Sequence, residues 1–200
     1  MADERRPYRM KRRAELEAQT RLRITESAVA LHGTLGPART SISAIANHAG
    51  VRRSTVYRHF PDEAALFAAC SSHWRAANPP PEPGRWRAVE RPDERLRVAL
   101  EELYEHFRCT ERMRENVLRD EEVMPTVKEA LEGYHAYLAS AVDELMRGRR
   151  IRGHEARRVR AALGHALAFT TWQSLARRQG LDDVQAADLM CRLVACAADA

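Results

Sequence analysis

Between Ser41 and Phe60 the chain carries two short helical patterns on either side of a glycine. The first pattern follows a capping residue, Thr40 or Ser41, and its apolar positions share one helix face: Ile42, Ile45, Ala46 and Ala49. Gly50 stands where this helix must stop and the chain must turn sharply, because glycine adopts a positive φ without a Cβ clash. Val51 and Val56 can close the angle with the next helix. The spacing predicts two short helices packed at an angle.

The second of these helices is left with polar and basic side chains around its outside: Arg52, Arg53, Ser54, Thr55, Tyr57, Arg58 and His59. This order is the helix-turn-helix arrangement, in which the second helix enters the major groove of DNA. Pro61 then opens a further helix with Asp62 and Glu63 in its first turn, where negative charge is favourable. The alternative interpretation is that the basic side chains only form a solvated helix face.

The positive charge of the chain is concentrated in its first part. Residues 1–75 hold 13 Lys and Arg against 7 Asp and Glu, which gives +6. Residues 76–200 hold 20 against 21, which gives −1. The total of +5 indicates a polyanionic partner only weakly. Its asymmetric distribution predicts a nucleic-acid-binding module followed by a nearly neutral body.

Helical spacing continues along the rest of the chain, and no stretch alternates as a strand does. We expect an all-α fold, with an N-terminal three-helix helix-turn-helix DNA-binding domain and a C-terminal helical bundle that dimerises. The expected divisions are a basic, flexible arm at 1–14, the helix-turn-helix domain at 15–76, a Pro-rich connector at 77–92 and the helical ligand-binding and dimerisation domain at 93–200. Within the last, helices are expected at 93–109, 111–120, 126–147, 154–179 and 183–198.

Other classes of protein are disfavoured by what the sequence lacks. No apolar run approaches the roughly 18 residues of a membrane helix, and the charged start does not resemble a signal peptide, so we expect a cytoplasmic protein without a membrane partner. The four cysteines fit no disulfide framework. Phosphate-cradling glycine loops and a nucleophile elbow are missing. Glu132 and His135 form only one Glu-x-x-His unit, where a di-iron bundle needs two. We therefore expect no enzyme activity, no catalytic residues, no cofactor and no metal.

The motif around Gly50 belongs to a longer set of positions in register: Arg23, Ile24, Ala28, Leu31, Gly36, Thr40, Ser41, Ile42, Ile45, Ala46, Ala49, Gly50, Val51, Thr55 to Pro61, Leu66 and Phe67. With this set, about 50 of the 200 residues resemble the TetR family of transcriptional regulators. The resemblance implies a homodimeric DNA-binding protein, commonly a repressor, whose all-α C-terminal domain binds a small-molecule inducer.

By the same resemblance, Ser41 and Thr55 meet phosphates at helix starts, while Arg53, Ser54 and Tyr57 face bases. The full set of expected DNA-binding residues is Ser41, Ser43, Arg52, Arg53, Ser54, Thr55, Tyr57, Arg58 and His59. The chain departs from the family's pattern at four positions. Glu63 replaces a phosphate-contacting Lys, Arg52 and Ser54 replace Ser and Gly in the turn, and His32 replaces an aromatic residue.

The basic run from Arg5 to Arg13 has two interpretations. It can be a solvated tail, or a minor-groove arm like those attached to some helix-turn-helix domains. A membrane-surface helix is disfavoured, because no apolar face accompanies the charges.

Two apolar stripes near the C-terminus predict a four-helix dimer interface. The candidate residues are Val159, Ala162, Leu163, Ala166, Thr170, Gln173, Ala186, Leu189, Met190, Leu193, Val194 and Ala197. The alternative is that both stripes are ordinary core within one chain.

A sensor pocket would lie among helices 93–147 and 154–179 and would be lined by aromatic, Met and occasional polar residues. The candidates are Leu103, Tyr104, Phe107, Met124, Tyr134, Tyr137, Leu138, His165, Phe169 and Trp172. Taken singly, such a residue is more often plain core than a ligand contact.

Together these features predict a TetR-like regulator that is released from a near-palindromic DNA operator by an unknown small-molecule effector and acts as a homodimer. Two alternatives stay open: an all-α metal or small-molecule-binding enzyme, and a regulator without a small-molecule sensor.

Overall fold

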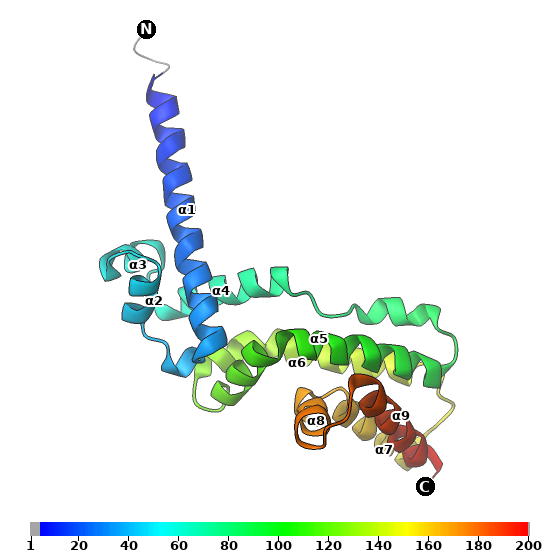
Figure 1. Cartoon of the computed structure of the whole chain (residues 1–200). Coiled ribbons are helices and arrows are strands. Elements are labelled where there is room, and N and C mark those ends of the chain that lie inside the picture. Colours follow the sequence, from blue (N-terminus) through cyan, green and yellow to red (C-terminus); the bar gives the residue numbers. More distant parts are fainter. Residues whose placement is uncertain (1–4, 200) are drawn as a thin grey trace. The chain divides into compact units, whose positions relative to one another are not determined.

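The computed structural model describes the backbone of residues 5–199 and the side chains of residues 10–198. All regular structure in this part of the chain is helical, as the sequence predicts (Figure 1). The chain divides into two compact units: residues 1–79 with 112–130, and residues 80–111 with 131–200. Each unit therefore takes segments from both halves of the sequence. The expected division at a Pro-rich connector differs from this, because part of the C-terminal half packs into the first unit.

The first unit is built on α1 (Arg5–Thr34). It is followed by the short 3-10 turn η1 (Pro37–Arg39), α2 (Ile42–His48), α3 (Arg53–His59) and α4 (Glu63–Ala77). The end of α5 and the start of α6 complete the unit. Its core is made of side chains that are almost fully buried: Ile24, Ala28, Ile45, Ala46, Val56, Phe60, Leu66 and Cys70. Helices α1 to α4 thus surround one apolar centre, on which α2 and α3 are held.

Helix α1 begins earlier than the sequence indicates. The apolar period starts at Leu16, whereas the helix already runs from Arg5. The basic arm expected at residues 1–14 is therefore helical from Arg5 onward, and its first four residues lie outside the described part of the chain. Straight-chain residues such as Arg, Lys and Met have high helix propensity, which supports a helix without an apolar face.

The last turn of α5 (Pro92–Asp120) holds the C-terminal end of α1. Asn116 Nδ2 donates to the backbone oxygens of His32 and Gly33 at 3.1 and 3.0 Å. Asp120 Oδ2 accepts from the backbone nitrogen of Ala38 at 2.9 Å. Asn116 thus supplies a donor to carbonyls in the last turn of α1, and Asp120 supplies an acceptor to a backbone N–H just beyond it. This hydrogen bonding explains why residues 112–130 belong to the first unit.

The second unit contains the 3-10 turn η2 (Pro83–Ala88), most of α5 and α6 (Pro125–Met146), α7 (Gly153–Ala166), α8 (Phe169–Gln173), the π-helical turn η3 (Ser174–Arg178) and α9 (Asp183–Asp199). Helices α7 and α9 lie side by side (Figure 1). The predicted break near residue 110 is absent, because α5 runs without interruption from Pro92 to Asp120. Within it, Thr110 Oγ1 donates to the His106 carbonyl at 2.6 Å. No helix among the described residues is long and apolar enough to cross a membrane.

The single helix expected at 154–179 is interrupted in the structure. Helix α7 ends at Ala166, and Ala168 is extended, with φ −73° and ψ 133°, before α8 begins. At 3.6 residues per turn, a residue three positions further along is displaced by about 60° around the helix axis, so nine positions give about 180°. In an unbroken helix, Trp172 would therefore lie opposite Leu163. The break lets both side chains reach the core, where each has no exposed surface.

The Pro-rich stretch is packed rather than a free connector. Trp86, in η2, is 1% exposed, and its Nε1 donates to Glu102 Oε2 at 2.8 Å. Tyr137 donates from its hydroxyl to the Pro81 carbonyl at 2.9 Å. From Pro80 onward this stretch therefore belongs to the second unit.

Candidate nucleic-acid interface

The turn between α2 and α3 has the geometry that the sequence predicts. Ser41 caps α2, with its Oγ accepting from the Ala44 nitrogen at 3.1 Å. Gly50 has φ 64°, and a Cβ at this position would meet no other atom. Glycine is therefore required there by the backbone conformation and not by lack of space. The Val51 nitrogen donates to the Ala46 carbonyl at 2.9 Å and closes the turn. Thr40 does not cap α2; its hydroxyl donates instead to the Gly36 carbonyl at 2.7 Å.

Helix α3 buries one side chain and exposes most of the others. Val56 is 1% exposed and anchors the helix on the core of the first unit. The residues expected to bind DNA are largely accessible: Ser41, Ser43, Arg52, Arg53, Ser54, Tyr57 and Arg58 are exposed, and Thr55 and His59 are half-buried. Seven of the nine are thus accessible on α2, the turn and α3. We call these nine residues the reading surface.

Arg53 and Tyr57 form a pair on the reading surface. They lie one turn apart on α3, with Arg53 Nη2 3.1 Å from the Tyr57 hydroxyl and the guanidinium carbon 5.5 Å from the centre of the tyrosine ring. Tyr57 is 38% exposed, so its ring stands out from the core and can support the arginine. A guanidinium held over an aromatic ring keeps its fork of donors available to a base edge or a phosphate.

Arg21 contacts the end of α3, which the sequence does not indicate. Its Nη1 donates to the carbonyl of His59, the last residue of α3, at 2.6 Å. Its guanidinium lies 4.1 Å from the centre of the Phe60 ring. These contacts join α1 to the C-terminal end of α3, and only the fold brings the two positions together. An exposed arginine on a helix carries no sequence signal for this role.

The surroundings of His59 lower the pKa of its imidazole. Burial lowers its pKa, and the charges of Arg58 and Arg21 lower it further, against a smaller opposing effect of Glu17. Its Nε2 is buried without a hydrogen-bond partner in the described structure. The end of α3 therefore holds a polar atom that protein groups leave unsatisfied.

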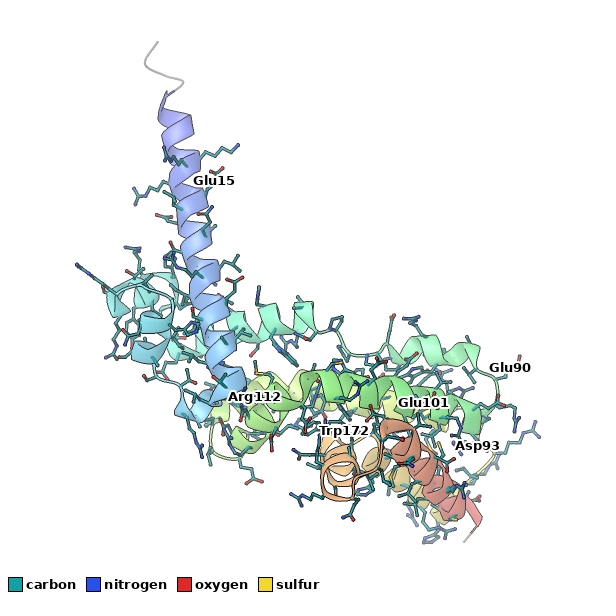
Figure 2. All side chains as sticks on the ribbon, viewed as in Figure 1. Glu15, Glu90, Asp93, Glu101, Arg112 and Trp172 are labelled. Atoms are coloured by element: carbon teal, nitrogen blue, oxygen red, sulfur yellow. The ribbon has the colours of Figure 1, made fainter. Side chains whose placement is uncertain are left out.

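Five of the ten candidate sensor residues come together in the second unit. Phe107 packs edge-on against Phe169, with ring centres 5.5 Å apart, and lies 6.0 Å from Trp172, which is labelled in Figure 2. Tyr104 stacks 6.3 Å from Phe107 and donates to the Ala166 carbonyl at 2.8 Å. Leu103 is likewise buried. Burial raises the pKa of Tyr104.

The other five sensor candidates are less buried, and one of them lies in the first unit. Tyr134, Tyr137 and Leu138 are half-buried on α6, and His165 is exposed on α7. Met124 belongs to the first unit.

Among the described residues, no group of three or more His, Cys, Asp or Glu side chains is placed to hold a metal ion.

The candidate dimer residues divide into two sets. Six are buried within a single chain: Val159, Leu163, Ala166, Ala186, Met190 and Val194. They are buried within the single chain, on the paired helices α7 and α9, and their place in a dimer interface stays a prediction. The six with surface left for a second copy are Ala162, Thr170, Gln173, Leu189, Leu193 and Ala197. Leu189 and Leu193 are 37% and 50% exposed on α9.

Comparison with known proteins places this surface in a known domain. Residues 24–70 match the family model described as bacterial regulatory proteins, tetR family, which confirms the resemblance found in the sequence. The matched range includes α2, the turn and α3. No protein of curated function matches the chain.

The fold is similar to several solved structures. A TetR-like transcriptional regulator from Rhodococcus sp. RHA1 is 19% identical, with a TM-score of 0.64 over 88% of this chain and 93% of that one. NalD, the secondary repressor of the MexAB-OprM multidrug efflux pump in Pseudomonas aeruginosa, is 19% identical, with a TM-score of 0.58 over 90% and 96%. The fatty acid degradation regulator FadR from Bacillus halodurans is 16% identical, with a TM-score of 0.56 over 88% and 94%. At these identities the likeness shows the fold.

Proposed function

We propose that this chain, whose residues 24–70 carry the tetR-family domain, is a DNA-binding transcriptional regulator in the cytoplasm and acts as a repressor rather than an enzyme. The observation that carries the proposal is the reading surface. Helix α3 is anchored by one buried valine and exposes two arginines, a serine and a tyrosine after a tight turn. A short helix that presents such side chains is suited to the major groove, which is wide enough to admit it.

Within the reading surface, Arg53 and Tyr57 are proposed to set sequence preference. A guanidinium binds the O6 and N7 acceptors of guanine in a bidentate manner, and each such contact contributes about 1–3 kcal/mol of discrimination. The tyrosine supports the arginine and offers a hydroxyl to the nearest phosphate. Ser41, Ser43 and Thr55 are proposed to bind phosphates and so to fix the position of α3.

A single α3 reads only a few base pairs, so we infer that two copies bind together. Two half-sites one helical turn apart or slightly more then form a near-palindromic operator. Leu189 and Leu193 on α9 are the proposed centre of the contact between copies, since they are the large apolar side chains of that helix face that remain accessible.

Release by a small-molecule effector is proposed to act through α5. This helix is shared by both units, and its last turn holds the end of α1 through Asn116, Arg119 and Asp120. An effector bound in the second unit would favour a conformation in which the two copies of α3 are wrongly spaced for two half-sites. The aromatic cluster around Phe107 is packed and buried, so such a ligand would have to enter between its rings.

Selection of bound duplexes from a random-sequence DNA pool tests the proposal. Wild-type protein should enrich a near-palindromic sequence. Arg53→Ala and Tyr57→Phe should weaken binding to that duplex by roughly 1–3 kcal/mol, because each removes a base or phosphate contact. The matched control is Arg157→Ala, an exposed arginine on α7 in the second unit, which should bind normally.

Two outcomes would contradict the proposal. One is that no sequence is enriched over the starting pool by the wild-type protein. The other is that Arg53→Ala and Arg157→Ala bind the enriched duplex equally well.

A further inference from the structure

The N-terminal part of α1 extends beyond the helices that pack on it. Every side chain from Met10 to Gln19 is exposed, whereas Ile24 and Ala28 further along are fully buried. Figure 1 shows this part of α1 clear of α2, α3 and α4, and Figure 2 labels Glu15 on it. A helix of this length with no side packed against a core is solvated unless it meets a partner.

The extension carries a dense positive charge. Residues 5–13 contain Arg5, Arg6, Arg9, Lys11, Arg12 and Arg13, with no Asp or Glu among them. Within the described residues, Arg13 pairs with Glu17 at 3.1 Å, and no ion pair is formed by Lys11 or Arg12. Their charge is therefore available to an anionic partner.

The extension does not have the pattern of a membrane-binding or protein-binding helix. Its large apolar side chains, Met10 and Leu16, are 68% and 56% exposed. Six residues correspond to about 600° of helical rotation, so the two point to different faces. A helix that inserts into a membrane interface or a coiled coil needs a continuous apolar face. The chemistry of the extension fits a strongly charged polyanion.

The fold ties this extension to the reading surface. Arg21, just beyond its end, donates to the last carbonyl of α3 and lies over Phe60. Lys11 is ten residues before Arg21, which corresponds to about 15 Å along a helix. Duplex DNA rises about 3.4 Å per base pair. Along the helix, Lys11 is therefore about four base pairs, and Arg5 about seven, from the level at which α3 ends.

The helical state decides which part of the duplex these cations can reach. An α-helix with side chains is about 10–12 Å across, whereas the minor groove is about 6 Å wide. A helix from Arg5 onward cannot enter that groove as an extended arm does. The part of the duplex that such a helix can reach is the sugar–phosphate backbone. Arginine and lysine bind its phosphates without reading sequence.

We propose that residues 5–13 form a second DNA contact, a helix that binds backbone phosphates of the duplex flanking the bases read by α3. The inference rests on the proposed function, because it requires α3 to be on DNA. The extension would contribute to the affinity for DNA and to its salt dependence, but not to sequence preference.

The test compares two duplexes and two triple variants. The probe is the duplex enriched from the random pool, made once with the two half-sites alone and once with about ten flanking base pairs on each side, one helical turn. The extension variant is Lys11→Gln, Arg12→Gln and Arg13→Gln, which keeps helix propensity because Gln, Lys and Arg are alike in this respect. The control variant is Arg150→Gln, Arg152→Gln and Arg178→Gln, which removes the same charge from exposed positions in the second unit.

Wild type and the control should bind the flanked duplex about tenfold or more tightly than the short one, with a steeper salt dependence. The extension variant should lose this difference, and the slope of log affinity against log salt should fall by about 0.9 for each phosphate contact removed. Equal slopes for all three proteins on the flanked duplex would overturn the inference. So would unchanged DNA binding with weakened binding to anionic lipid vesicles, which would assign the extension to a membrane surface.

Failure of this inference is distinguishable from failure of the proposed function. In the first case the protein still enriches and binds its operator, but the flanks contribute nothing. In the second case no duplex is enriched at all, and both proposals fall together.

Discussion

At the scale of single residues, His32 shows how strongly one position depends on its surroundings. Its side chain is 7% exposed, lies 3.5 Å from the Cys70 sulfur and packs 5.4 Å from the centre of the Phe67 ring. Burial lowers the pKa of His32 to about 4, against a smaller opposing effect of Asp120. The thiol beside it is inert for the same reason, since burial raises the pKa of Cys70 to about 12.

The lowered pKa of His32 predicts a pH-dependent stability. Below about pH 6.5 the unfolded chain binds a proton at this histidine that the folded chain refuses, so the free energy of unfolding falls as the pH drops from about 6.5 to about 4. The contribution reaches about 3 kcal/mol at the acid end. Substitution His32→Phe keeps a ring against Phe67 and removes the titration.

Urea unfolding of wild type and His32→Phe at about pH 7 and about pH 4.5 measures this effect. The variant should lose less stability between the two conditions than the wild type. Equal losses would mean that His32 is not the group responsible.

At the scale of elements, the junction between α1 and η1 depends on the last turn of α5. Gly36 has φ 94° and ψ 157°, a conformation that is essentially confined to glycine. A Cβ there would also meet Arg119 and Asp120, whose side chains hydrogen-bond to the surrounding backbone. The backbone conformation and the lack of room for a Cβ each require glycine at position 36.

Gly36→Ala is expected to destabilise the protein by roughly 1–3 kcal/mol through strain, with more from the displaced side chains of α5. Gly133→Ala is the matched control, because Gly133 lies inside α6 with open space around it. That control should stabilise by about 0.5–1 kcal/mol, since alanine has the higher helix propensity. Thermal unfolding of the two variants checks both signs, and equal shifts would contradict the account.

Asp120→Ala tests the same junction from the side of α5. It removes the part-buried hydrogen bond from the Ala38 nitrogen to a carboxylate, and a hydrogen bond to a charged group contributes about 1.5–3 kcal/mol. Val123→Ala, at a position 70% exposed between α5 and α6, should change stability little. If Asp120→Ala were as stable as Val123→Ala in thermal unfolding, the role of the junction would be refuted.

The elements also show how far the sequence determines the structure. The helix-turn-helix could be predicted because its signals are local: the Ser41 cap, the apolar spacing of α2 and the positive φ of Gly50. The break between α7 and α8 could not, because it satisfies the burial of Trp172 against residues far along the chain. Arg21 was missed for a similar reason, since its partner is 38 residues away.

At the scale of the whole molecule, periodicity alone did not separate core from interface. The stripes on α7 and α9 have the same helical spacing whether they face each other or a second chain. The structure resolves six of these positions as core of a single chain, including Val159, Leu163 and Met190. The exposed leucines of α9 are left as the surface on which the proposed dimer depends.

The double substitution Leu189→Asp and Leu193→Asp should therefore convert a dimer to a monomer. Dimerisation would bury two unpaired carboxylates in the centre of the interface, and the cost of removing them from water would not be offset. Sedimentation of the purified protein across a range of concentrations measures the change. Val123→Asp adds a charge at an exposed apolar position of the first unit and should leave the association unchanged. Sedimentation as a dimer with both leucines replaced would place the interface elsewhere.

The central claim is that the exposed face of α3 reads DNA sequence, and the affinity of Arg53→Ala for two duplexes tests it most directly. One duplex carries the sequence that the wild type enriches, and the other carries the same bases in scrambled order. The account predicts that Arg53→Ala loses about tenfold or more of its affinity for the enriched duplex but little for the scrambled one, so that the ratio between them shrinks. An unchanged ratio would contradict it.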